Sequence, residues 1–355
     1  MSKRGIELQF HWIFILIAGA LILAFFFNVV QKQQVLSEQK LAITLASQMD
    51  AIYTGAIESK GTVQPLATPR PGIAFSCSDA CECNYRIGSK ATEFRDKLVF
   101  APAFLKDQDT LAWAAEWKLP FRIANFLMLS SPNIKYNIMY DVGNQRSAQA
   151  YKRFIKTLPK EVNQETFSSM GVMGQFTPQG NAHTRFVFIG IAPQSTSTLG
   201  LSQEFEHEDV SGIYIDPDYR TVVFYEKEPD ELSFNAYPSI LAGEATAQAA
   251  MTAADHLLYD CVMKRAFERL SVIAQVQRSR AQAIQAEMDL LGRVECTYVV
   301  QDLEGIATAA GALAHSPDFR LQELTESNLG IILGAQGELE RQNTNLFRQS
   351  CPELY

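Results

Sequence analysis

Residues Phe10 to Val30 read FHWIFILIAGALILAFFFNVV, and this stretch decides how the rest of the chain is arranged. No charged residue occurs between Glu7 and Lys32. About 20 residues of α-helix cross the hydrocarbon core of a bilayer, so the stretch predicts one transmembrane helix. We therefore expect residues 10–30 to have the lipid bilayer as their partner.

The composition of the 355 residues describes a folded chain. Hydrophobic residues make up 47% of it, which is enough to build a buried core. The formal net charge is −8, and no dense run of Lys or Arg occurs. Because nucleic-acid binding needs clustered cations that neutralise phosphates, we expect no nucleic-acid partner.

The cysteines indicate which side of the membrane holds the bulk of the chain. Their number is even, and all of them follow the apolar stretch: Cys77, Cys81, Cys83, Cys261, Cys296 and Cys351. In an exported chain this pattern predicts disulfides in an oxidising compartment. We therefore expect residues 1–9 to be cytoplasmic and the rest of this single-pass protein to be extracytoplasmic.

The leader before the apolar stretch carries a resemblance. Lys3-Arg4-Gly5, followed by Ile6-Glu7 and a long apolar helix, resembles the leader of type IV pilin-like proteins. In that family cleavage follows the glycine and the helix packs into a filament, but there the glutamate is the fifth mature residue, whereas here it would be the second. The apolar leader, WKLPFR and SCPELY are also similar to single-anchor membrane proteins of small-genome archaea, a resemblance that implies no function. No small-x-small site follows Phe27, which favours an uncleaved anchor over a secretory signal.

Residues 31–61 predict a helical stalk, which is followed by an α/β domain over residues 62–242. Its first motif is a C-x3-C-x-C cluster that begins at Cys77. Such a cluster could bind metal through thiolates, or it could be a disulfide-pinned loop. No histidine stands nearby, so we expect disulfides, no metal, and at least one bridge to a distant cysteine.

Alternating apolar segments predict the elements of this domain. Residues 110–119 (TLAWAAEWKL) predict a short amphipathic helix on which Trp113 and Trp117 share one face. These two residues are either part of the core or an exposed site that binds sugar or a partner. Residues 134–140 predict a strand that leads, through the turn DVGNQR, to a helix from Ser147 to Leu158 with Ser147 as N-cap. Residues 211–227 predict a β-hairpin at a sheet edge, and the acidic run over residues 204–209 predicts a solvated surface or a calcium site. The pattern favours a mixed α/β sheet of the Rossmann-like kind.

No catalytic or nucleotide-binding motif occurs. DVGNQR is not a G-x-G-x-x-G sequence, and GVMGQF is not a Walker sequence, so we expect no cofactor. A hydrolase stays open as an alternative, because triads assemble from distant positions. If the sheet binds a ligand, the strand end predicts a site at Asp141, Asn144 and Arg146.

Residues 243–355 predict a coiled-coil-like helical hairpin. From residue 244 to residue 291 there is no Pro or Gly, and Gly292 ends the helix. Apolar residues there follow a 4-3-4-3 spacing, with a similar seam in the last helix from about residue 319 to residue 349. The seams consist of Met263, Phe267, Leu270, Ala274, Gln277, Ala281, Ile284, Met288 and Leu291, and of Leu329, Ile332, Gln336, Leu339, Asn343 and Leu346.

The two seams either pair with each other or bind another protein. Cys261 and Cys351 would fall at the same end of an antiparallel pair, which predicts a Cys261–Cys351 disulfide and a bridge from Cys296 to the N-terminal cluster. The sequence as a whole predicts an α+β membrane protein that acts as a structural or adhesive component of a cell-surface assembly, through a protein partner or self-association. The alternative is an anchored surface enzyme or receptor that uses the α/β domain.

Overall fold

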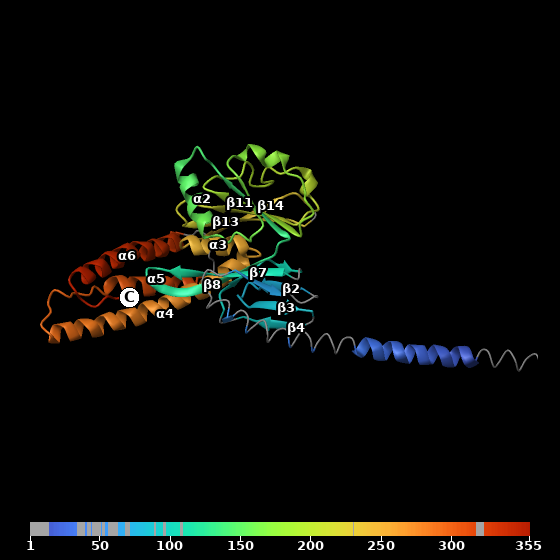
Figure 1. Cartoon of the computed structure of the whole chain (residues 1–355), viewed down its shortest axis with the longest axis horizontal. Coiled ribbons are helices and arrows are strands. Elements are labelled where there is room, and N and C mark those ends of the chain that lie inside the picture. Colours follow the sequence, from blue (N-terminus) through green and yellow to red (C-terminus); the bar gives the residue numbers. More distant parts are fainter. Residues whose placement is uncertain are drawn as a thin grey trace, which may run out of the picture.

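A computed structural model describes residues 14–33, 40, 44, 51, 54–55, 63–67, 72–88, 90–94, 97–106, 109–229, 231–316 and 323–355 (Figure 1). Among these residues, one helix is long and apolar enough to cross a membrane: Phe14–Gln33, of 20 residues and mean hydropathy 2.4. It carries most of the predicted span. Residues 1–13, and the predicted stalk apart from residues 31–33 and a few single positions, lie outside the described residues.

Two four-stranded sheets form the part of the fold drawn beside β2, β3 and β7 in Figure 1. The first has the order β1-β7-β8-β5, with the bounds Gln64–Ala67, Asp109–Lys118, Arg122–Ser130 and Val99–Phe100. The second has the order β4-β3-β2-β6, with the bounds Lys90–Glu93, Cys83–Ile87, Ile73–Cys77 and Phe104–Leu105.

The helix predicted over residues 110–119 is wrong, because residues 109–118 form strand β7. β7 pairs antiparallel with both β1 and β8, and these ladders take up the backbone hydrogen bonds that a helix would have made. Residues four apart share a face in a strand as well as in a helix, so the tryptophans fit both. Trp113 and Trp117 are 3% and 1% exposed, which confirms the core interpretation. Their indole N–H groups donate to Gln248 Oε1 at 3.3 Å and to the Ala242 carbonyl at 3.0 Å.

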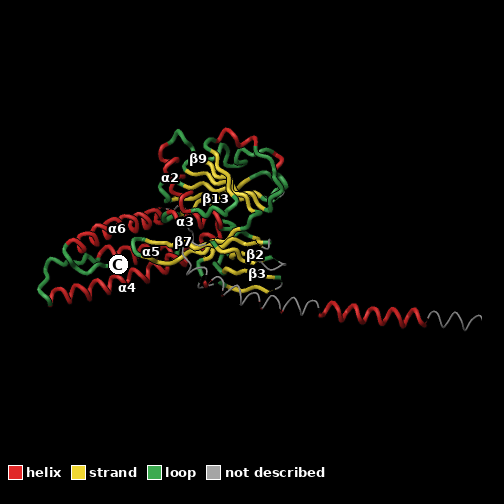
Figure 2. The backbone as a smooth tube through the Cα atoms, in the orientation of Figure 1, coloured by secondary structure: helices red, strands yellow, loops and turns green. Residues whose placement is uncertain are grey.

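A six-stranded sheet forms the upper part of the fold in Figures 1 and 2. Its order is β10-β9-β11-β12-β13-β14, with the bounds Gln164–Phe167, Ile134–Tyr140, His183–Ile189, Val210–Ile215, Thr221–Lys227 and Phe234–Ile240. The first four strands are parallel to one another, β13 runs antiparallel to β12, and β14 runs antiparallel to β13. From β9 the chain passes through helix α2, Gln145–Thr157, to β10, and then crosses to β11 on the other side of β9. The parallel strands thus have the doubly wound order found in many α/β proteins.

Two local predictions for this sheet need correction. The β12–β13 hairpin is confirmed, but it is not an edge, because β14 continues the sheet beyond β13. The N-cap of α2 is Asn144, whose side chain accepts from the N–H groups of Arg146 and Ser147. Ser147 instead lies inside the first turn, where its hydroxyl donates to the Ile189 carbonyl at 2.6 Å and so joins α2 to β11.

The predicted uninterrupted helix over residues 244–291 is two helices, α3 (Glu244–Thr252) and α4 (His256–Leu290). The chain leaves helical geometry at Ala253, and Asp255 restarts it as the N-cap of α4, accepting from the Leu258 N–H at 2.7 Å. Helix α5 (Gln301–Ala314) packs against both α4 and α6 (Glu323–Arg348). The region is therefore a three-helix arrangement instead of the predicted hairpin of two.

Most residues of the two seams are buried within the chain. Among the largest of them, Phe267, Leu270, Ile332 and Leu339 are fully buried, whereas Leu291 is 64% exposed. The same buried cluster includes residues of α3, of both four-stranded sheets and of one face of the six-stranded sheet. It therefore extends to both sides of residue 243, where the helical hairpin was predicted to begin. The opposite face of that sheet packs a second cluster around Phe186 and Phe188.

Three disulfides join the six cysteines: Cys77–Cys83, Cys81–Cys261 and Cys296–Cys351. The predicted Cys261–Cys351 bridge is wrong, because Cys261 lies at the sheet end of α4 whereas Cys351 follows the far end of α6. The expectation that the N-terminal cluster bridges to a distant cysteine is confirmed by Cys81–Cys261, whose partners are 180 residues apart in sequence. This bridge ties α4 to the β2–β3 hairpin.

Candidate functional site

The predicted ligand residues Asp141, Asn144 and Arg146 follow β9 at the carboxyl edge of the parallel strands. Each makes a local contact. Asp141 accepts from the Gly143 N–H at 2.8 Å, Asn144 caps α2, and Arg146 pairs with Asp218 in the turn of the β12–β13 hairpin. These contacts shape the turn and hold it to the hairpin. None of the three residues lines the cleft described below.

A row of polar side chains crosses the six-stranded sheet near the opposite, amino edge of its parallel strands. The row follows the strand register, in which Tyr136 of β9 is paired with Arg185 of β11, Arg185 with Ser211 of β12, and Ser211 with Glu226 of β13. Because side chains alternate between the two faces of a strand, these residues share the face that carries Val187 and Ile213 further along. This face of the sheet is thus apolar where it packs in the core and polar near the amino edge.

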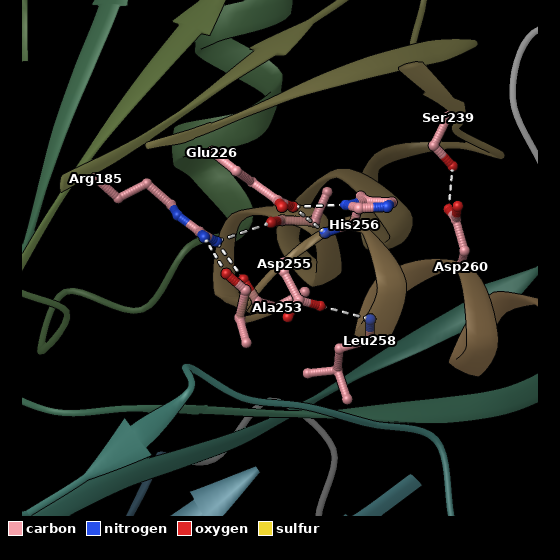
Figure 3. A network of polar contacts seen from close by, with 10 residues as sticks. Arg185, Glu226, Ser239, Ala253, Asp255, His256, Leu258 and Asp260 are labelled. Atoms are coloured by element: carbon pink, nitrogen blue, oxygen red, sulfur yellow. Dashed lines mark hydrogen bonds and ion pairs between the residues drawn. The ribbon is translucent and has the colours of Figure 1, made fainter. Parts of the chain in front are cut away.

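Arg185 is the central residue of this row, and it is only 4% exposed. Its guanidinium donates to the carbonyl of Met251 at 2.9 Å, to that of Ala254 at 2.8 Å, and to that of Ala253. Figure 3 shows it reaching from β11 to the junction of α3 and α4. The last carbonyls of a helix have no partner within the helix and carry partial negative charge, so a buried cation satisfies them. Burial lowers the pKa of Arg185 from its usual value, while Tyr136, Glu226, Asp255 and Asp209 act in the opposite direction.

Beside Arg185, three side chains form a chain of hydrogen bonds. His183 Nδ1 lies 2.9 Å from Asp209 Oδ1, and His183 Nε2 lies 2.8 Å from Ser211 Oγ. Arg185 Nε donates to the same serine oxygen at 2.8 Å. The Asp209 side chain is 72% exposed; partial desolvation acts to raise its pKa, but the hydrogen bond and charge of His183, with the charges of Arg185 and Lys227, hold that pKa below its usual value.

On the other side of the row, Glu226 binds the start of α4. Its Oε1 accepts from the backbone N–H of His256 and lies 2.7 Å from Nδ1 of the same residue (Figure 3). The His256 ring stacks on Tyr237 with a centroid separation of 3.9 Å. Burial would lower the pKa of His256, but the hydrogen bond and charge of Glu226, with Asp260 and Asp255, raise it overall.

A cleft of about 570 Å³ opens over this polar row. It lies between the amino edge of the six-stranded sheet, the β5–β6 segment and the α3–α4 junction, and its volume is within the usual range for small-molecule sites. Three cationic side chains and five carboxylates line it: Lys106, Arg185, Lys227, Glu208, Asp209, Glu226, Glu228 and Asp255. These eight side chains carry a formal net charge of −2.

Two segments predicted as possible metal sites take other roles. The sulfurs of Cys77, Cys83 and Cys261 lie within 4.8 Å of one another, but they belong to two disulfides and are not thiolate ligands. In the acidic run, the ammonium of Lys227 binds the carbonyls of Glu206 and Glu208, and Asp209 binds His183. Only part of this run is therefore a solvated surface.

The residues of the cleft leave one signal in the sequence. In the strand over residues 183–189, His183 and Arg185 are in phase with the inward Val187 and Ile189, so a charged residue is placed at a core position. Comparison with protein families, with curated proteins and with solved structures finds no match to this chain.

Proposed function

We propose that this chain is a membrane-anchored receptor whose extracytoplasmic part binds a small cationic ligand in the cleft over Arg185. The apolar helix Phe14–Gln33 is the anchor. The three disulfides support an extracytoplasmic location for the folded part, since such bonds persist in oxidising compartments.

The observation that carries the proposal is the charge of a preformed cleft. Two of its three cationic groups are already engaged, because Arg185 donates to the end of α3 and Lys227 to two carbonyls, and the third, Lys106, is exposed. The carboxylates of Glu208, Glu226 and Glu228 line the same space at partial exposure. A ligand that carries a positive charge complements the lining, whereas an anion is repelled.

The test uses the full-length protein in detergent and measures its thermal unfolding with ethanolamine, putrescine or lysine, and with acetate or succinate for comparison. A cation at ten times its Kd should stabilise the fold by about 1.4 kcal/mol. Glu228→Gln removes one lining charge and should weaken cation binding several-fold. Glu204→Gln, an equal change on an exposed residue outside the cleft, should leave it unchanged. Equal stabilisation by anions, or none by any cation, would overturn the proposal.

A second function, as a component of a cell-surface assembly, is supported by the far end of the helical region. There the Cys296–Cys351 bridge and Arg293, which donates to the Gln349 and Ser350 carbonyls, hold the end of α4 beside the end of α6. Large apolar side chains are exposed at this end: Leu290 at 89%, Leu291 at 64%, Val294 at 82% and Phe347 at 69%. Exposed apolar residues gathered on a rigid element favour contact with another protein.

Native mass spectrometry of the full-length protein, purified from its own membranes, tests this second function. We expect an oligomer or a stoichiometric partner that is lost when Leu290, Leu291 and Val294 are replaced by Ser. Val142→Ser is the control, because Val142 is 68% exposed on the turn after β9, away from this end. A monomer without partners would refute the assembly role.

A further inference from the structure

We propose that Ser211, His183 and Asp209 form a catalytic relay that hydrolyses small acyl esters in the cleft. This inference rests on the proposed function in one respect: the cleft must admit a small ligand. It goes further by assigning a reaction to the residues that line it.

The geometry is that of a nucleophile, a base and an orienting acid. Side chains at alternate positions of two adjacent parallel strands bring the three together, since Asp209 and Ser211 are two residues apart beside β11 and His183 begins that strand. The imidazole bridges its neighbours, at 2.9 Å to the carboxylate and 2.8 Å to the hydroxyl. Ser-His-Asp relays are recognised by such roles and distances, and they recur on unrelated folds in different chain orders.

Arg185 fixes the direction of the serine hydroxyl. A hydroxyl has one proton to donate, and its oxygen here already accepts from Arg185 Nε at 2.8 Å. The Ser211 proton is therefore available to His183 Nε2. With Nδ1–H donating to Asp209, Nε2 carries the lone pair that receives this proton. This is the tautomer that a general base needs.

The same arginine also stabilises the charge that develops during attack. Arg185 is 4% exposed and its Nε lies beside the serine oxygen, where a positive charge favours an alkoxide and the adjoining tetrahedral oxyanion. Because the low pKa of Asp209 keeps that carboxylate ionised at neutral pH, it can orient the imidazole and stabilise it once protonated.

The reaction balances with water as the only co-reactant. Ser211 Oγ attacks the ester carbonyl carbon while its proton passes to His183 Nε2. The carbon–oxygen bond to the leaving group then breaks, and His183 returns the proton to the departing alkoxide, which leaves as an alcohol. Water, deprotonated by His183, cleaves the acyl-serine, so that a carboxylic acid is released and Ser211 is restored. The net negative lining favours esters that are neutral or carry a positive charge.

The test treats the full-length protein in detergent with a fluorophosphonate and locates the adduct by peptide mass spectrometry. We expect modification of Ser211, and turnover of p-nitrophenyl acetate that falls at least about 100-fold in Ser211→Ala and in His183→Gln. Ser239→Ala is the matched control and should retain turnover, because Ser239 is also a buried strand serine that donates to a carboxylate, that of Asp260.

The adduct site on the unmodified protein decides the question even if Ser211→Ala does not fold. No adduct, or an adduct on another serine, would overturn the relay. Stabilisation by cations without any adduct would leave the receptor proposal standing and reject only catalysis. An adduct on Ser211 without any cation preference would support the relay and reject the cationic ligand.

Discussion

Replacing Arg185 by methionine should destabilise the fold more than replacing any exposed arginine of the described chain. Methionine keeps much of the aliphatic length but removes every donor. The carbonyls of Met251, Ala253 and Ala254 would then lose their partner at the end of α3, where Met251 and Ala253 are fully buried.

The magnitude follows from these contacts. A buried acceptor left without a partner costs about 1–3 kcal/mol, and partial rearrangement or water entry recovers some of that cost. Three such acceptors would cost about 3–9 kcal/mol before any rearrangement, so we expect about 3–5 kcal/mol here. Arg185→Lys keeps the charge but has three donors in place of five, and it should lose roughly half as much.

Thermal unfolding of the full-length protein in detergent, followed by near-UV circular dichroism, measures the effect. The Tm of Arg185→Met should fall by roughly 6–10 °C, since each kcal/mol corresponds to about 2–4 °C in a protein of 150–250 residues and to less in a longer one. Arg341→Met is the control, because the Arg341 side chain is 73% exposed and pairs with Glu338 on the surface of α6, where such pairs contribute about 0–1 kcal/mol. A Tm for Arg185→Met within 2 °C of the unmodified protein would refute the view that this residue secures the α3–α4 junction.

Three further predictions concern the disulfides, a histidine and a glycine. Non-reducing peptide mapping should find the pairs Cys77–Cys83, Cys81–Cys261 and Cys296–Cys351, and any other pairing would contradict the fold. Replacing both Cys296 and Cys351 by Ser opens a loop of 55 residues and should lower the free energy of unfolding by about 4 kcal/mol, through the loss of loop-closure entropy. The folded state raises the pKa of His256, so protonation of the ring stabilises the fold fully below its unfolded pKa of about 6.5, and this contribution disappears as the pH rises through the folded pKa. The Tm difference between the unmodified protein and His256→Gln should therefore be larger at pH 5.5 than at pH 9. An equal difference at the two pH values would disprove the role of Glu226. Gly190 has a φ of +63°, and an added Cβ would lie 3.0 Å from Ser147 Cα, so Gly190→Ala should lower the free energy of unfolding by about 1–3 kcal/mol. Gly88→Ala is the control, because Gly88 has a φ of +57° and nothing within 4 Å of an added Cβ, and its loss of stability should be smaller. Equal Tm values for the two variants would count against close packing of α2 on β11.

The sequence predicts best where one physical requirement acts alone. The apolar helix is visible because about 20 uncharged residues in succession, a length that could cross a bilayer, form a helix without help from the rest of the chain. The β12–β13 hairpin is visible because Asp216-Pro217-Asp218 supplies turn chemistry between two β-rich runs. Neither feature depends on what the rest of the chain does.

Predictions failed where a tertiary contact chose between two local possibilities. The spacing of Trp113 and Trp117 fits both helical and strand periods, and pairing of β7 with two neighbours decided for the strand. The break after α3 contains neither Pro nor Gly. It depends on Asp255 as a cap for the next helix and on Arg185, about 70 residues earlier, as a partner for the carbonyls. No local pattern around residue 253 could have revealed that arginine.

The position of the cleft has a similar origin. In doubly wound sheets, ligands usually bind beyond the carboxyl ends of the parallel strands, which is where Asp141, Asn144 and Arg146 were expected to act. Here that edge is occupied by the α2 cap and by the ion pair from Arg146 to the hairpin turn.

The amino edge instead receives the end of α3, whose carbonyls require a buried cation. Arg185 supplies this cation from β11 and leaves its Nε directed at Ser211, within reach of His183. The contact that completes the fold is thus also the contact that orients the serine hydroxyl. Arg185→Lys therefore separates the two roles, because a lysine could still hold the α3 carbonyls but would lack the Nε–H that reaches Ser211. If the relay is correct, this variant should lose ester turnover by a larger factor than its loss of stability explains, at a temperature where it remains folded.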